Sequence, residues 1–454
     1  MKIIVVGCGK IGKTIIASLT KEHHDVTAID SDAKVTEEIR NAYDVIGITG
    51  SGTEYDVMTE AGVSKAELFI AVTGSDELNM LSCFAARRMG AKHTVARIRD
   101  LENNDESLSF MSKHLELSLA INPEKMAAEA IYNILKLPSA TKVETFSRGR
   151  FEIVEVLLGS GSPLDGLSLM ELRKKYQEKF LVSTVERDGE VYIPNGTFVL
   201  KSGDKVGVIT LRKEAHRVLS AIGHTKISVK NVMIIGAGKV SNYLAKILLA
   251  TRHSVKLIDI DPEVCEEVCE VLPDNATVVC GNGMSQELLT EEGLDSADAI
   301  VALTGRDEDN ILISVYSAGK NVPKVILKVN SDELTPIAEN LGLNSIISPR
   351  KIVADVMVKY ARALENSMGS TIETLYSLCG GRAEAVEFKI MDDFEYAGVP
   401  LKEMKLSSGV LIAGISREKD DILPSGDDVI LPGDRVIIIA GGKRILSLSD
   451  IFAG

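Results

Sequence analysis

The sequence contains no tryptophan, and only 4% of its 454 residues are aromatic. Proteins that bind single-stranded nucleic acids stack bases on aromatic side chains, and this composition offers little such surface. The formal net charge of −14 also disfavours binding to a phosphate backbone or to anionic lipid headgroups. We therefore expect no nucleic-acid partner and no direct insertion into lipid.

Long apolar runs are missing as well. A membrane-spanning helix needs about 18 or more mostly apolar residues, whereas the longest runs here, such as residues 436–440, have the length of a strand. The chain passes directly from Met1 into an apolar run, so we expect no signal peptide. The six cysteines are scattered, and although Cys265 and Cys269 fit one helix face, we interpret them as reduced, partly buried thiols. A cytoplasmic protein is expected.

One motif is present twice. A short apolar run ends in a Gly-x-Gly turn and continues into a helical pattern, in both halves of the chain. The two turns are Gly7-Cys8-Gly9-Lys10-Ile11 and Gly236-Ala237-Gly238-Lys239-Val240. Glycine permits so tight a turn, and its missing Cβ lets a pyrophosphate approach the amides at the helix start. The position between strand and helix predicts two dinucleotide-binding turns.

The rest of the chain repeats with the motif: Gly7 and Gly236 are 229 residues apart, as are Asp30 and Asp259. Strand-sized apolar runs alternate with amphipathic stretches, which is typical of a parallel sheet covered by helices on both faces. The runs are at 3–6, 26–29, 45–48, 68–72, 94–98 and 119–121, and again at 232–235, 255–258, 277–280, 299–303, 324–329 and 345–347. We predict an α/β fold with two Rossmann-like, doubly wound parallel-sheet domains, each followed by a small α+β domain.

The domain boundaries follow from this pattern. The Rossmann domains are predicted at 1–123 and 230–349, connecting helices at 124–140 and 350–368, and the small domains at 141–226 and 369–454. In the first small domain, strand-like runs at 151–158, 180–187, 198–200 and 205–211 lie between turn clusters. The apolar stripe of the first connecting helix fits a neighbouring domain or subunit as well as its own sheet. A repeat this long indicates a fused pseudo-dimer.

An acid ends the second strand of each Rossmann domain: Asp30 in the first and Asp259 in the second. A carboxylate there accepts hydrogen bonds from both ribose hydroxyls and repels a 2′-phosphate. It therefore favours adenosine, NAD(H) or ATP/ADP over NADP(H). Helix capping is the structural alternative for both acids.

Small loops follow the fourth strands, Thr73-Gly74 in the first unit and Thr304-Gly305 in the second. They lie at the carboxyl edge of the sheet, where ligands of open α/β folds bind, and leave room for adenine or for the distal half of a dinucleotide. The next residues of the first loop, Ser75-Asp76, fit an N-cap equally well.

Two arginines, Arg97 and Arg99, close the fifth strand of the first unit. Strand alternation puts both on one face, where they clamp phosphates or pair with acids. The second unit has Lys328 in place of Arg97, and Ser241 in place of the third fingerprint glycine, Gly12. These differences predict different affinities or ligand preferences at the two turns.

Catalytic motifs are missing from the sequence. There is no zinc spacing, nucleophile elbow or Gly-Lys-Ser/Thr phosphate loop. We expect a nucleotide-binding protein that is not an enzyme. The alternatives are an NAD-dependent oxidoreductase and a nucleotide-sensing transcription factor, and the missing basic patch disfavours the latter.

The glycine turn, the Thr-Gly-Ser-Asp-Glu loop at 73–77 and the Pro-Gly-Asp-Arg-Val run at 432–436 resemble RCK domains, the regulators of potassium conductance. The resemblance covers essentially the whole chain. It implies a homotetramer that forms a cytosolic gating ring, peripheral on the inner face of the plasma membrane, beneath a TrkH-like potassium-translocating membrane subunit. It also implies that NAD(H) and ATP/ADP shift the ring between conformations, with phosphates held by the amides of Gly9, Lys10 and Ile11 and by Arg97.

Overall fold

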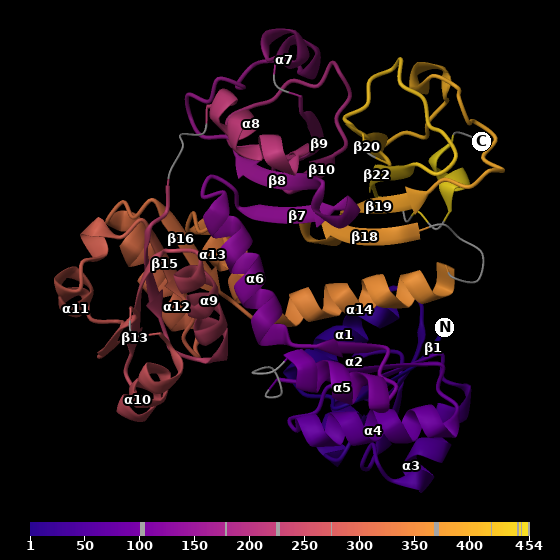
Figure 1. Cartoon of the computed structure of the whole chain (residues 1–454), viewed down its shortest axis with the longest axis vertical. Coiled ribbons are helices and arrows are strands. Elements are labelled where there is room, and N and C mark those ends of the chain that lie inside the picture. Colours follow the sequence, from indigo (N-terminus) through magenta and orange to yellow (C-terminus); the bar gives the residue numbers. More distant parts are fainter. Residues whose placement is uncertain are drawn as a thin grey trace.

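The computed structural model describes residues 1–99, 105–177, 179–223, 228–273, 275–366, 372–418, 420–442, 445 and 447–452. The predicted boundaries at 226, 368, 369 and 454 lie outside these ranges. Two α/β lobes and two small β lobes are visible in Figure 1, with the two β lobes side by side. No helix among the described residues has the length and apolarity needed to cross a membrane.

The first Rossmann lobe is a six-stranded parallel sheet in the order β3-β2-β1-β4-β5-β6. The order reverses between β1 and β4, which opens a crevice at the carboxyl ends of these strands. Its elements are β1 (Lys2–Val6), α1 (Lys10–Lys21), β2 (Asp25–Asp30), α2 (Ala33–Ala42), β3 (Ile46–Thr49), α3 (Tyr55–Glu60), β4 (Leu68–Ala71), α4 (Asp76–Met89), β5 (His93–Arg97), α5 (Asp105–His114) and β6 (Leu119–Ile121).

The second Rossmann lobe repeats this topology in the order β14-β13-β12-β15-β16-β17, again all parallel. The predicted fold class is thereby confirmed. The elements are β12 (Asn231–Ile235), α9 (Lys239–Ala250), β13 (Ser254–Asp259), α10 (Pro262–Val271), β14 (Thr277–Cys280), α11 (Gln286–Glu291), β15 (Ala299–Ala302), α12 (Asp307–Gly319), β16 (Lys324–Lys328), α13 (Leu334–Asn340) and β17 (Ile346–Ile347).

Each small lobe is a five-stranded antiparallel sheet, ordered β10-β9-β11-β8-β7 in the first and β18-β19-β22-β20-β21 in the second. The first contains β7 (Lys142–Phe146), β8 (Phe151–Leu157), α7 (Leu169–Lys175), β9 (Leu181–Arg187), β10 (Glu190–Tyr192), β11 (Lys205–Leu211) and α8 (Ala215–Ala221). The second contains β18 (Ile372–Leu378), β19 (Ala383–Lys389), β20 (Val410–Arg417), β21 (Asp420–Ile422) and β22 (Arg435–Gly441).

The prediction of a strand at 198–200 is wrong. Only Val199 forms a bridge, with Ser168. The apolar residues of this segment serve packing instead: Leu200 is fully buried in the core of the lobe, and the Phe198 ring lies under the Arg187 guanidinium, 5.0 Å from its centroid.

The two connecting helices, α6 (Pro123–Lys136) and α14 (Pro349–Asn366), are exchanged between the units. Ile131 and Ile134 of α6 are buried in the core of the second Rossmann lobe, where α6 packs along α9. Val353 and Met357 of α14 are buried in the core of the first Rossmann lobe, along α1. Figure 1 shows both pairings. The stripe of the first connecting helix therefore faces a neighbouring domain.

An ion-pair cluster fixes α14 at its other end. The Arg362 side chain is buried and donates to both carboxylate oxygens of Glu384 in β19, at 2.8 and 3.0 Å. Its Nε donates to Glu22, which follows α1. Because buried charges are retained only when they are paired, this cluster ties α14 to the first Rossmann lobe and to the second β lobe.

Lys324, at the start of β16, predicts a pH dependence of stability. Its buried ammonium donates to the Ala140 carbonyl (2.5 Å) and to Ser345 Oγ (2.8 Å), and burial lowers its pKa to about 7. The unfolded chain, with the ordinary lysine pKa of 10.5, binds more protons between these two values. Stability contributed by this site therefore rises with pH from about 7 to about 10.

We expect the Lys324→Met variant to lose this rise, so that its unfolding free energy falls relative to wild type as the pH increases. Denaturant titrations across that range measure the difference. The Lys230→Met change at an exposed lysine is the control and leaves the rise intact. A difference between wild type and Lys324→Met that is constant with pH contradicts the assignment.

Candidate nucleotide-binding site

Both glycine turns have the backbone that their sequence predicts. Gly7 and Gly236 have φ of +91° and +93°, and a Cβ on Gly7 would lie 2.7 Å from the Thr73 amide nitrogen. By contrast, a Cβ on Gly9 or Gly238 would meet nothing within 4 Å. These two glycines are the N-caps of α1 and α9, and no side chain caps either helix. Each turn thus presents a helix N-terminus to open space, which favours an anion.

The third fingerprint position differs between the units. A Cβ on Gly12 would lie 1.9 Å from the Gly7 carbonyl oxygen, so α1 sits directly against the turn. In the second unit the buried Ser241 occupies this position, and its hydroxyl donates to the Gly236 carbonyl. At this position of the second unit, a side-chain hydrogen bond therefore replaces the direct backbone packing of the first unit.

The two predicted ribose acids accept the same hydrogen bond from their glycine turns. Asp30 Oδ2 accepts from the Cys8 amide (2.6 Å), and Asp259 Oδ2 accepts from the Ala237 amide (2.6 Å). The helix caps of α2 and α10 are Asp32 and Asp261, not these acids. The acids two residues further along therefore cap the helices, and the capping alternative is wrong for Asp30 and Asp259. These two acids lie at the strand ends beside the glycine turns.

Sequence reasoning missed a buried asparagine that holds the Thr73-Gly74 loop. Asn79 Oδ1 accepts from the Thr73 amide (2.8 Å) and hydroxyl (2.7 Å), while Nδ2 donates to the Arg97 carbonyl (3.0 Å). In the second unit Asn310 makes the same bonds to Thr304 and to the Lys328 carbonyl. The signal was present, because each asparagine follows its threonine by six residues.

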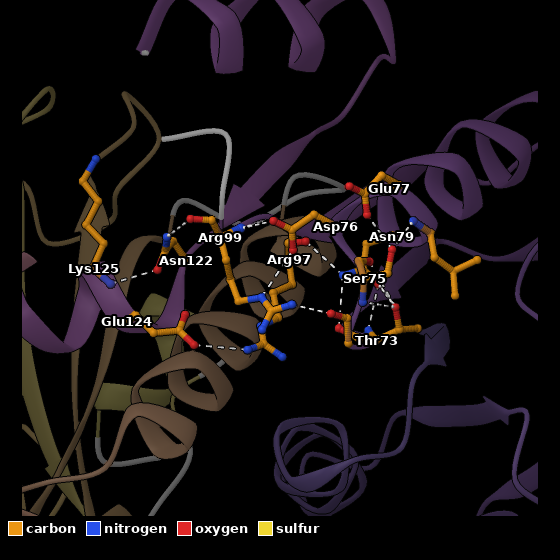
Figure 2. A network of polar contacts seen from close by, with 12 residues as sticks. Thr73, Ser75, Asp76, Glu77, Asn79, Arg97, Arg99, Asn122, Glu124 and Lys125 are labelled. Atoms are coloured by element: carbon orange, nitrogen blue, oxygen red, sulfur yellow. Dashed lines mark hydrogen bonds and ion pairs between the residues drawn. The ribbon is translucent and has the colours of Figure 1, made fainter. Parts of the chain in front are cut away.

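Ser75 and Asp76 have structural partners. The Ser75 hydroxyl accepts from the Leu78 amide and caps α4. Asp76 accepts from the Arg99 amide and from Arg99 Nε (3.4 Å). Figure 2 shows this network, in which Arg99 and Arg97 reach different acids. Arg99 is therefore committed to an ion pair within its own lobe.

Arg97 takes part in the exchange of helices. Its Nη2 donates to Glu124 Oε1 (3.1 Å) in the first turn of α6, as Figure 2 shows. The buried Arg97 Nε and Glu124 Oε2 have no hydrogen-bond partner among the described residues. Unsatisfied buried polar atoms are rare in folded proteins, and here they lie at the wall of a cavity.

That cavity has a volume of about 830 Å³ and is lined by both units. The predicted site residues that line it are Gly7, Gly9, Lys10, Ile11, Asp30, Thr73, Gly74 and Arg97 from the first unit, and Gly238, Lys239 and Val240 from the second. The predicted residues that do not line it are Cys8, Gly236, Ala237, Asp259, Thr304 and Gly305. The two turns of one chain therefore open into a common space, to which the first unit contributes its predicted ribose acid, Asp30.

The exchanged helices begin at this cavity. Pro123 and Glu124 of α6 and Pro349 and Arg350 of α14 line it, together with Lys328. Sequence reasoning missed these four helix residues, because no local sequence pattern indicates that the N-termini of the two helices lie at the same cavity. Burial lowers the pKa of Lys328, and Arg350 acts in the same direction. An anionic ligand would relieve this repulsion between neighbouring cations.

Two glycine turns on parallel sheets, each with a small antiparallel lobe, define a duplicated RCK-type fold. Solved structures share it. The GsuK channel bound to NAD is similar with a TM-score of 0.63 and 18% identity, over 97% of this chain and 76% of that one. The GsuK RCK domain is similar with a TM-score of 0.62 and 17% identity, over 97% and 92%. At this identity the likeness is one of fold.

The sequence itself matches the TrkA-N domain family at residues 3–114 and 232–349, and the TrkA-C domain family at 153–223 and 385–453. It is 31% identical to the Trk system potassium uptake protein TrkA homolog of Archaeoglobus fulgidus, over the full length of both chains. It is 29% identical to the Trk system potassium uptake protein TrkA of Vibrio alginolyticus, over 98% of this chain and 97% of that one. The chain belongs to the TrkA family of Trk system potassium uptake proteins.

The Gly12 contact generates a prediction. In a Gly12→Ala variant the new methyl group overlaps the Gly7 carbonyl, so α1 must move away from its sheet. We expect the unfolding free energy to fall by about 1–3 kcal/mol, the usual cost of overpacking. Denaturant titration measures it. A Gly74→Ala variant, where the methyl group enters open space, is the matched control. Equal stability of the two variants contradicts the packing described here.

Proposed function

We propose that this chain is the nucleotide-binding regulatory subunit of a Trk-type potassium uptake system. It binds NAD(H) and ATP or ADP and controls potassium flux through a TrkH-like membrane subunit. The observation that carries the proposal is the common cavity, because a ligand there contacts both glycine turns and the starts of both exchanged helices. Family membership and the name of the NAD-bound channel with this fold support the choice of ligand and process.

In the proposed complex, phosphates lie at the N-terminus of α1, at the amides of Gly9, Lys10 and Ile11. Asp30 accepts hydrogen bonds from the ribose hydroxyls, and the Thr73-Gly74 loop borders the space for the remainder of the ligand. Arg97 supplies a positive charge from the same lobe. At the second turn Gly238, Lys239 and Val240 have the corresponding position, with Asp259 as the ribose acceptor.

Regulation follows from the charges of the opposite unit. A ligand shifts a conformational equilibrium only by the difference in its affinity for the two states. Lys328 and Arg350 contact a phosphate only while the two Rossmann lobes hold their present positions, so an anion favours this arrangement. The starts of α6 and α14 move whenever the lobes separate, and these helices transmit the change to the β lobes.

The proposed assembly is a homotetramer that forms a ring. Equivalent apolar side chains stay exposed on α4 and α12: Leu81 and Leu312 have exposed fractions of 55% and 56%. Phe84 and Val315 follow three residues later on the same helices, half-buried and exposed respectively. Apolar residues repeated on corresponding helix faces suit contacts with further copies of the chain. In this arrangement the ring meets the membrane through its protein partner.

The proposed role includes no reaction of the bound nucleotide. None of the described residues that line the cavity is a histidine, tyrosine or cysteine. The oxidoreductase alternative predicts sustained hydride turnover with some substrate, which the present proposal does not. Measuring NADH consumption against a panel of carbonyl substrates separates the two functions.

The ribose assignment predicts unit-specific losses of affinity. We expect Asp30→Ala and Asp259→Ala each to weaken binding at its own unit by about 1–2 kcal/mol, because a pair of ribose hydrogen bonds is lost. Calorimetric titration with NADH, NAD, ATP and ADP measures this. Asp25→Ala, at the opposite end of the strand that carries Asp30, is the control. Wild-type affinities in both site variants would remove the assignment.

A further inference from the structure

The two units differ in one side-chain pair beside the ribose acids. In the first unit, Thr36 in α2 and Thr49 at the end of β3 are joined by a hydrogen bond, with 2.8 Å between their Oγ1 atoms. In the second unit the corresponding residues are Cys265, the fourth residue of α10, and Cys280, the last residue of β14. The register agrees, because Thr49 pairs with Asp30 and Cys280 pairs with Asp259 in the parallel ladders. The fold therefore points these two cysteine side chains at one another.

The contacts of Cys265 support this placement. Its Sγ lies 3.6 Å from the Asp259 carbonyl oxygen and 3.9 Å from the Val279 carbonyl oxygen, directly over the strand ends. The Cys280 thiol lies close enough to raise the pKa of Cys265. Cys265 is buried, whereas Cys280 is exposed and open to a reagent in solution. One thiol is thus accessible and the other is held behind it.

We propose that Cys265 and Cys280 form a redox-reactive dithiol, which a low-molecular-weight disulfide converts into an intramolecular disulfide in the second unit alone. The reduced thiols predicted from the scattered cysteine positions are then the resting state. Disulfides in reducing compartments are usually transient or redox-sensing. The first unit has hydroxyl groups at these positions, so the corresponding bond cannot form there.

The chemistry is thiol–disulfide exchange. The Cys280 thiolate attacks one sulfur of the reagent, RS–SR, which forms a mixed disulfide and releases RS⁻; this takes up the proton that Cys280 lost. Cys265 then loses its proton and attacks the Cys280 sulfur, releasing the second RSH. Two protein thiols are oxidised by two electrons, and the reagent is reduced to two thiols. Desolvation and the neighbouring Cys280 and Asp259 raise the pKa of Cys265 to about 11, so the first attack comes from Cys280.

The new bond has a structural consequence. It joins α10 to β14, while Asp259, the last residue of β13, precedes α10 in the chain and pairs with Cys280 in the sheet. Oxidation therefore fixes the edge of the second Rossmann lobe that carries its ribose acid and leaves the first lobe unchanged. The two nucleotide turns of one chain acquire different sensitivities to the redox state.

The test treats the full-length folded protein with glutathione disulfide. We expect the intact mass to fall by two hydrogens, a non-reducing peptide map to show Cys265 linked to Cys280, and dithiothreitol to reverse both. A Cys265→Thr/Cys280→Thr double variant copies the first unit, so it keeps the fold and loses the linked peptide. Cys269→Ser, one helical turn from Cys265, retains it.

Three outcomes would overturn the proposal: a glutathione adduct that accumulates on Cys280 without closure, a link from Cys280 to Cys269 instead, or a Cys265–Cys280 link that forms only after unfolding. Because the readout is covalent mass, the result does not depend on whether nucleotides bind.

Discussion

The exchange of α6 and α14 between the two units is the constraint on which the rest of the structure depends. Each Rossmann sheet needs apolar cover on the face beside its first helix, and each receives it from the helix that follows the other lobe. Separating an exchanged helix from its sheet would expose fully buried side chains of that helix, such as Ile131 of α6 or Met357 of α14. The free-energy cost is about 1.5–3 kcal/mol for each large side chain. The exchange therefore fixes the two glycine turns on a common cavity, and the proposed sensing depends on that geometry.

Duplication also supplied the means to make the two halves unequal. Equivalent positions at the cavity carry different charges: Arg97 and Glu124 in the first unit, Lys328 and Arg350 in the second. Arg97 is paired with Glu124, whereas Lys328 and Arg350 are both cations, so the second unit adds positive charge to that of Arg97. In the proposed complex, an anion at the first turn therefore meets charges at residues 328 and 350, on the other half of the sequence. A single unit would lack this coupling.

Much of the fold could be predicted because its determinants are local. Buried parallel strands are continuous apolar runs, and glycines with positive φ mark the turns. The partner of α6 could not be predicted, since helical periodicity shows that one face is buried and not what covers it. The partners of Arg97 and Arg99 could not be predicted for the same reason. Strand alternation places both side chains on one face, but it does not show that Arg97 pairs with Glu124 in α6 and Arg99 with Asp76 in α4. Asn79 recurs as Asn310, but an amide side chain in a helical pattern does not indicate which loop or strand it will hydrogen-bond, so its role could not be predicted.

The central claim is that both units build the nucleotide site at the first turn, and the most direct test measures ADP binding there after a change in the second unit. In an Asp259→Ala background, which weakens binding at the second turn, an added Arg350→Gln change should weaken ADP binding at the first turn about five- to tenfold through loss of a charge-assisted contact to phosphate. Arg252→Gln, an exposed site on the same lobe, should have no effect. An ADP affinity that is unchanged by Arg350→Gln would contradict the account, because the first turn would then bind its ligand without the opposite unit.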